Sequence, residues 1–78
     1  MDKTIVSQDY LLSWMNSLIG RYDSCDNCHF TSVLLTEPDE DGCNWSSANL
    51  RCSGVLIDVC RPIAQRVVDD AKKKFNVD

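Results

Sequence analysis

Five cysteines give this chain of 78 residues its densest chemistry. Cys25 and Cys28 form a C-x-x-C pair, the spacing at which two thiolates on a tight turn reach one zinc ion. A structural zinc site needs two further ligands, and Cys43 and Cys52 are the candidates. Because a predicted strand with eight intervening residues separates those two, we expect one of them, rather than both, to return to the C-x-x-C loop.

Two other states of the cysteines remain open. Five is an odd number and no apolar leader follows Met1, so reduced thiols in the cytoplasm are the default for this chain. A buried thiol behaves as a small hydrophobe, and Cys60 fits this role because it lies on the apolar stripe of a predicted helix. We therefore favour free, buried thiols and no cofactor, with a zinc site or one or more disulfides as alternatives.

The single histidine, His29, bears on metal binding and on catalysis. It is disfavoured as a zinc ligand beside Cys28, because neighbouring side chains on a strand point to opposite faces. A nucleophilic pair of His29 with Cys43 or Cys52 across a hairpin is geometrically allowed. However, a domain of this size has little room for a substrate cleft, and the sequence contains no phosphate-binding loop or nucleophile elbow. We therefore expect a protein without enzymatic activity.

The net charge of −4 is unevenly distributed along the chain. Residues 23–41 contain no Lys or Arg, whereas residues 61–74 carry five basic side chains. An acidic surface repels phosphate backbones and attracts basic proteins, so we expect a protein partner with a basic surface and no direct contact with nucleic acid. The acidic candidates for partner binding are Asp23, Asp26, Glu37, Asp39, Glu40 and Asp41. Residues 37–41 alone would also be explained as a solvated loop tip.

Trp45 follows the acidic turn among polar residues and has two interpretations. An exposed Trp beside charged residues is typical of a binding hot spot, so Trp45 joins the candidate partner-binding residues. Alternatively, Trp45 lies on the inner face of a hairpin and packs against a helix, since a small domain needs its aromatic residues in the core.

The pattern of apolar residues predicts one small α+β domain over residues 1–78. Helical spacing and an N-cap at Ser7 predict a helix over 8–20. Residues 30–36 and 43–52 read as two strands around a turn at 38–42. The second helix lies within 55–75, and because of Pro62 it either begins near Arg61-Pro62 after a separate turn or contains Pro62 in its first turn. The predicted order is helix, strand, strand, helix, with one further short strand from Ile5-Val6 or from 55–57.

Size and composition limit the function. No apolar run approaches the roughly 18–20 residues that span a bilayer, so we expect no membrane contact. Domains this small have marginal cores, and a disulfide, a metal or a homodimer through the helical faces would compensate.

We therefore expect a small acidic protein-interaction module that occupies a basic, nucleic-acid-binding surface of a larger partner. Inhibitors of bacterial defence complexes encoded by phages and mobile elements, including anti-CRISPR proteins, are similar in size and charge, and this likeness rests on those two properties alone. The alternative is a small zinc-stabilised module built on Cys25 and Cys28 with Cys43 or Cys52.

Overall fold

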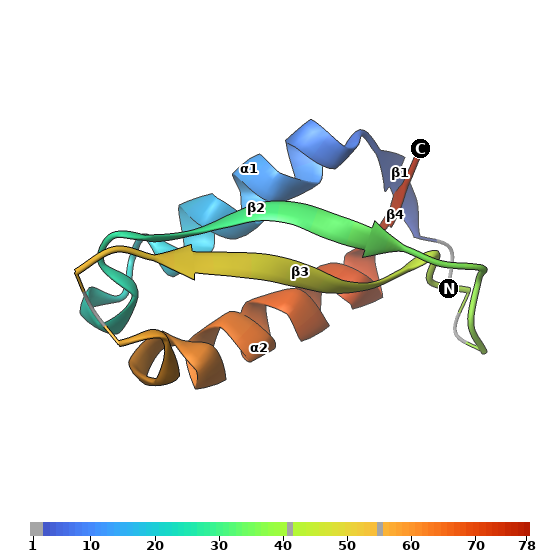
Figure 1. Cartoon of the computed structure of the whole chain (residues 1–78). Coiled ribbons are helices and arrows are strands. Elements are labelled where there is room, and N and C mark those ends of the chain that lie inside the picture. Colours follow the sequence, from blue (N-terminus) through green and yellow to red (C-terminus); the bar gives the residue numbers. More distant parts are fainter. Residues whose placement is uncertain (1–2, 41, 55) are drawn as a thin grey trace.

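The computed structural model describes residues 3–40, 42–54 and 56–78, and shows an α+β fold in two layers (Figure 1). An antiparallel hairpin forms one layer, and two helices pack against it, one beside each strand. A second, parallel pair of short strands joins the two ends of the chain. The elements in order are β1 (Thr4–Val6), α1 (Gln8–Ile19), the 3₁₀ turn η1 (Asp23–Cys25), β2 (Cys28–Leu35), β3 (Trp45–Cys52), α2 (Ile57–Lys74) and β4 (Phe75–Val77). The predicted order of helix, hairpin and helix is confirmed.

Local signals explain α1. The backbone N–H of Tyr10 donates to Ser7 Oγ at 3.1 Å, which caps the helix as predicted. The apolar spacing places Leu11, Met15 and Ile19 in the core with no exposed surface. The backbone N–H of Gly20 returns to the carbonyl of Asn16, and the helix ends there.

The second helix begins before its proline. Both predicted starts are wrong, since α2 runs from Ile57 and contains Pro62 in its second turn. Proline has no N–H to donate to the carbonyl of Asp58 one turn earlier, so one helical hydrogen bond is missing at this point. The buried side of α2 carries Cys60, Ala64, Val67, Val68 and Ala71, which face the hairpin and α1.

The predicted short strand at Ile5-Val6 is confirmed, and its partner is β4. Thr4 pairs with Phe75 and Val6 with Val77 in parallel register. Phe75 was predicted to end the last helix, and this is wrong, because the chain passes there directly into a strand. The Phe75 ring lies edge-on to Trp14, with 5.1 Å between ring centroids. No helix in the described part of the chain is long and apolar enough to cross a membrane.

The hairpin loop is anchored to β4 by side-chain amides. The backbone N–H of Val77 donates to Asn44 Oδ1 at 2.9 Å, and Asn44 Nδ2 donates to the Val77 carbonyl at 2.7 Å. Asn76 Nδ2 donates to the carbonyl of Gly42, whose φ of 81° suits glycine. These contacts fix the end of the hairpin against the joined ends of the chain.

Candidate functional site

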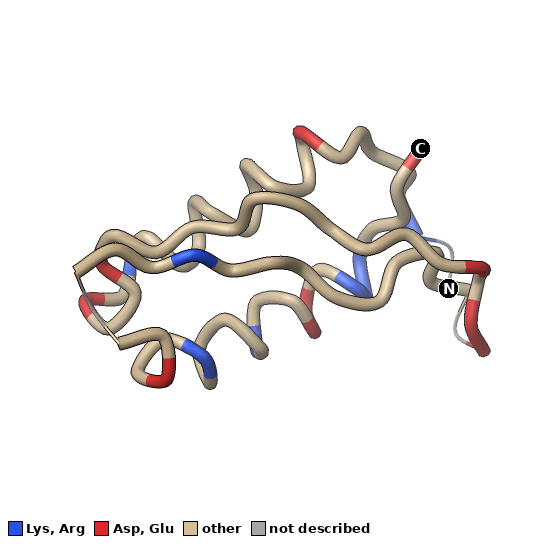
Figure 2. The backbone as a smooth tube through the Cα atoms, viewed as in Figure 1, with Lys and Arg blue, Asp and Glu red and all other residues tan. Residues whose placement is uncertain are grey.

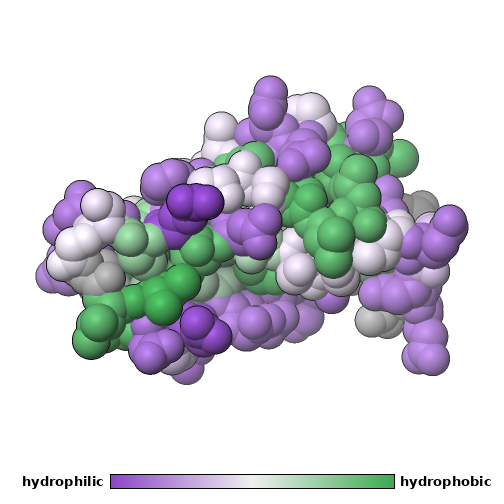
Figure 3. Space-filling model, viewed as in Figure 1, coloured by the Kyte–Doolittle hydropathy of each residue, from purple (hydrophilic) through white to green (hydrophobic). Residues whose placement is uncertain are grey.

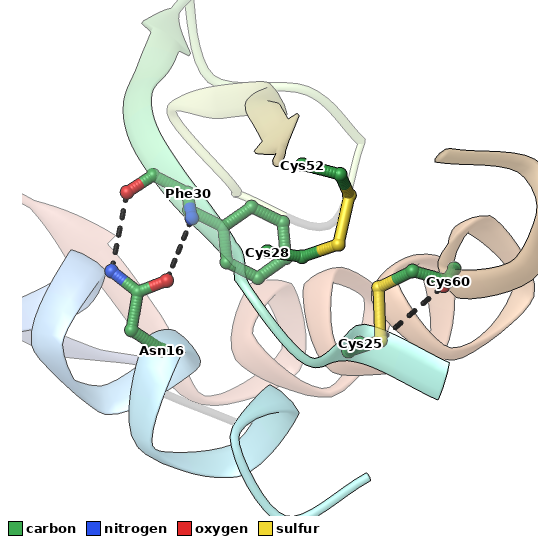
Figure 4. The surroundings of a disulfide bond; sticks show 6 residues. All are labelled: Asn16, Cys25, Cys28, Phe30, Cys52 and Cys60. Atoms are coloured by element: carbon green, nitrogen blue, oxygen red, sulfur yellow. Dashed lines mark hydrogen bonds between the residues drawn. A yellow bond between two sulfur atoms is a disulfide. The ribbon is translucent and has the colours of Figure 1, made fainter. Parts of the chain in front are cut away.

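Four cysteines from four separate segments meet at one end of the hairpin (Figure 4). One disulfide joins Cys25 at the end of η1 to Cys60 in the first turn of α2, and a second joins Cys28 to Cys52 across the hairpin. The Sγ atoms of Cys28, Cys52 and Cys60 all lie within 4.8 Å of one another. The two disulfides therefore form a single sulfur cluster, which ties α2 to the turn before β2.

The fifth cysteine lies elsewhere. Cys43 is 1% exposed near the opposite end of the hairpin, where its thiol donates to the Trp45 carbonyl at 3.1 Å. Its predicted place in a metal site with Cys25, Cys28 and Cys52 is therefore wrong, because β3 separates it from those three. The expectation that either Cys43 or Cys52, rather than both, returns to the C-x-x-C loop is confirmed for Cys52.

The favoured interpretation of free thiols holds for Cys43 and is wrong for the other four cysteines. Cys60 is fully buried on the apolar stripe, as predicted, but that stripe faces η1 and brings Cys60 to Cys25. His29 is exposed and pairs across the hairpin with Arg51. It thus points away from Cys28, as strand alternation predicts, and away from the sulfur cluster.

The acidic candidates are divided between the two ends of the molecule (Figure 2). Asp23 and Asp26 are exposed beside the sulfur cluster, whereas Glu37, Asp39 and Glu40 are exposed in the loop between β2 and β3. The eight residues of β2 separate these groups, which corresponds to about 26 Å of extended chain. The predicted acidic segment therefore forms two separate acidic surfaces, one at each end of the hairpin. Asp41 lies outside the described residues.

Trp45 is fully buried, so its predicted place on a partner-binding surface is wrong and the inner-face interpretation is confirmed. Its indole N–H donates to the carbonyl of Phe75 at 3.1 Å, which satisfies the only polar atom of the side chain. The polar neighbours of Trp45 on β3 misled the sequence analysis, because Ser46 and Ser47 take the exposed positions and leave the inner one to the indole.

A groove lies between β3 and α2, and no residue of it was predicted from the sequence as part of a site. Its volume is about 280 Å³. Its lining includes the small residues Ser46, Ser47 and Ala48 on β3 and Ala64 on α2, which leave space between strand and helix. The lining consists of Phe30, residues 46–50, Ile57, Arg61, Ala64, Gln65 and Val68. A run of small residues on a predicted strand, 46–48, is the sequence signal that could have indicated it.

The two outer edges of the hairpin differ. On β2, the backbone N–H of Phe30 donates to Asn16 Oδ1 at 2.6 Å and Asn16 Nδ2 donates to the Phe30 carbonyl at 3.1 Å (Figure 4). The N–H of Val33 donates to Gln8 Oε1 at 3.3 Å. Side chains of α1 thus occupy the hydrogen-bonding groups along the outer edge of β2, which closes this edge to another strand.

The outer edge of β3 at Ala48 and Leu50 has no such cover from the described residues. Phe30 pairs with Leu50 and Val33 pairs with Ala48. In an antiparallel pair, opposite residues have the same orientation of their backbone groups, so the N–H and C=O of Leu50 and Ala48 also point away from the partner strand. They point to the side of the groove, and among the described residues no side chain of α2 donates to or accepts from them. The edge of β3 is therefore open.

Apolar side chains are exposed near both ends of the hairpin (Figure 3). Leu34 and Leu35 at the end of β2 are 60% and 53% exposed, and Leu56 before α2 is 75% exposed. Each acidic end therefore carries apolar surface as well, a combination typical of protein contact surfaces.

Comparison of this chain with protein-family models, curated proteins and solved structures finds no match in any of the three.

Proposed function

We propose that this protein is a non-catalytic interaction module that binds an extended segment of a larger protein as a third strand along the edge of β3. The observation that carries the proposal is the difference between the two edges of the hairpin. Asn16 closes the edge of β2, whereas Ala48 and Leu50 leave theirs open beside a groove. Strand addition uses such an edge, with backbone hydrogen bonds supplying affinity and alternate side chains supplying specificity.

The groove has the shape that an added strand needs. A strand paired with β3 would lie about 4.8 Å from it, in the space between β3 and α2. Its inward side chains would contact Ala64 and Val68, which are buried and apolar, and its rim would be polar because Gln65 and Arg61 are exposed. A third strand would also stabilise the hairpin, since two-stranded sheets are marginal in water.

The acidic ends favour a basic partner. The exposed carboxylates at the two ends, Asp23 and Asp26 at one and Glu37 and Glu40 at the other, lie beyond both ends of β3. They would attract a segment with Lys or Arg on each side of its strand and would raise its rate of association. Basic segments of this kind are found on nucleic-acid-binding proteins, so occupation of the segment would inhibit such a partner in the way that small phage inhibitors act.

The test uses extended peptides selected from a random displayed library against the immobilised, oxidised protein. The Ala48→Pro variant removes one outward N–H, and an edge strand tolerates proline where its N–H is not in the ladder. We expect the selected peptides to lose at least about tenfold in affinity, a loss of about 1.4 kcal/mol. The matched control Ala48→Ser keeps the N–H and should bind as the native chain does.

A second variant tests the groove from the helix side. Gln65→Trp places a large ring over the groove without changing β3, and should abolish peptide binding, whereas Gln65→Ala should preserve it. Full binding by both Ala48→Pro and Gln65→Trp would overturn the proposal. Both variants should keep the hairpin folded, because neither shortens a side chain that packs against the core.

A further inference from the structure

We propose that Cys25, Cys28, Cys52 and Cys60 form a zinc site when their two disulfides are reduced. This inference is independent of the binding edge on β3. It rests on four sulfur atoms that four segments of the chain bring to one place (Figure 4). Four cysteine thiolates are a common ligand set of structural zinc.

The distances between the sulfur atoms suit a tetrahedral site. Zinc–sulfur bonds of about 2.3 Å place tetrahedral thiolates about 3.8 Å apart. The Sγ atoms of Cys28, Cys52 and Cys60 already lie within 4.8 Å of one another, and the Sγ of Cys25 is bonded to that of Cys60. Cleavage of each disulfide lets its two sulfur atoms separate by the roughly 1.8 Å that zinc requires, and rotation of the freed Cys25 side chain would bring its sulfur to the other three.

The backbone around the cluster presents the ligands in the manner of a metal-binding turn. Asn27, between Cys25 and Cys28, has a φ of 61°, so the chain makes a left-handed turn between the two cysteines of the C-x-x-C pair. Cys52 is the residue opposite Cys28 in the hairpin, and Cys60 approaches from the first turn of α2. Two ligands thus come from the turn, and the other two come from the strand and helix that follow it.

Burial makes this a closed site. Cys25 and Cys60 are 1% and 0% exposed, and Cys28 is 8% exposed. A metal ion among them would have four protein ligands and little access to water, which is the arrangement of structural zinc rather than of a catalytic centre. The ligand set differs from the one that the sequence favoured, because Cys60 takes the place of Cys43.

The chemistry balances with a thiol reductant. Each disulfide accepts two electrons and two protons from a low-molecular-weight dithiol, which becomes a disulfide itself, and two cysteine thiols result. Zinc then displaces the thiol protons as the four sulfurs coordinate as thiolates. In the reverse direction, an oxidant removes two electrons from each pair of thiolates, re-forms the two S–S bonds and releases the ion.

The exchange gives the domain a cross-link in either redox state. The disulfides join α2 to η1 and close the open end of the hairpin, and the zinc ion would hold the same four segments. A small domain depends on such a cross-link because its core alone supplies little stability. Reducing compartments would favour the zinc form and oxidising compartments the disulfide form.

The test is metal titration of the whole chain after reduction with a phosphine, in the absence of oxygen. We expect one zinc ion per chain, and with Co²⁺ the thiolate charge-transfer and d–d bands of tetrahedral sulfur coordination. Addition of diamide, a thiol oxidant, should release the metal completely. Reduced native protein that retains no zinc against a weak chelator, or that binds Co²⁺ without tetrahedral bands, would overturn the proposal.

Single substitutions identify the ligands. Cys28→Ser and Cys60→Ser should each weaken zinc binding by more than about 100-fold, because each removes a ligand. Cys43→Ser is the matched control, since it removes a buried thiol outside the cluster, and should leave the affinity unchanged. Loss of binding in Cys43→Ser together with full binding in Cys60→Ser would also refute this ligand set. If a variant fails to fold, the titration of the native chain still decides the question.

Discussion

Asn16 of α1 and Phe30 of β2 exchange two hydrogen bonds, in which the Asn16 side-chain amide acts as the next strand would. The carboxamide presents its oxygen and one of its two N–H groups side by side, so it satisfies both backbone groups of Phe30 at once. This pair makes the two edges of the hairpin unequal, and it directs any added strand to β3.

Removal of this cover should destabilise the fold and expose a second edge. Asn16→Ala leaves the N–H and C=O of Phe30 without their partners, and we expect the free energy of unfolding to fall by about 1–3 kcal/mol. The variant should also self-associate at high concentration. Denaturant unfolding and sedimentation velocity measure the two effects. Asn49→Ala, which removes an exposed amide that donates to Ser32 Oγ at 2.8 Å, is the control and should cost less than Asn16→Ala, because water replaces this partner.

The disulfide between Cys25 and Cys60 should contribute a large share of the stability of the oxidised protein. It closes a loop with a sequence separation of 35 residues, for which loop entropy predicts about 3–4 kcal/mol. We expect the double variant Cys25→Ala, Cys60→Ala to lose this amount in denaturant unfolding with a chelator present. An oxidised double variant as stable as the oxidised native chain would contradict the cross-link between α2 and η1.

Trp45 should behave as a core residue. Trp45→Phe leaves the Phe75 carbonyl without its indole donor and should cost about 1–3 kcal/mol beyond the change in volume. Thermal unfolding measures the loss. Trp14→Phe is a matched substitution in which a half-buried ring next to Phe75 is exchanged, and it should cost less. Equal losses in the two variants would argue against a special role for the indole hydrogen bond.

The acidic ends should control the rate of association with a basic partner. The double variant Glu37→Gln, Glu40→Gln should slow the binding of selected peptides with flanking lysines and reduce the dependence of the rate on salt. The control Asp69→Asn, Asp70→Asn removes the same charge from the exposed side of α2 and should have a smaller effect. Stopped-flow measurements at low and high salt provide the rates. Rates that do not change with salt in the native chain would exclude electrostatic steering.

The elements that were predicted correctly depend on neighbours in the sequence. The cap at Ser7 and the apolar spacing of α1 are local, and so is the turn at Gly42, so each left a readable pattern. By contrast, β4 becomes a strand because Phe75 pairs with Thr4 at the other end of the chain. A helical stripe that ends on Phe75 contains no sign of that pairing.

The site was less predictable for the same reason. The C-x-x-C pair indicated where two cysteines meet, but the approach of Cys60 depends on how α2 packs against η1. The difference between the two edges depends on Asn16, a polar residue of α1 whose role appears only when the hairpin is placed beside that helix. Sequence patterns describe each element, and the contacts between elements create the site.

The most direct test of the binding edge is hydrogen exchange at single amides of β3. In the free protein, the Ala48 and Leu50 amides should exchange rapidly, whereas the Asn49 amide, which faces β2, should be protected. Saturation with a selected peptide should slow exchange at Ala48 and Leu50 by at least about tenfold and leave exposed amides of α1 unchanged. A bound peptide that leaves both of these amides in rapid exchange would contradict strand addition along β3.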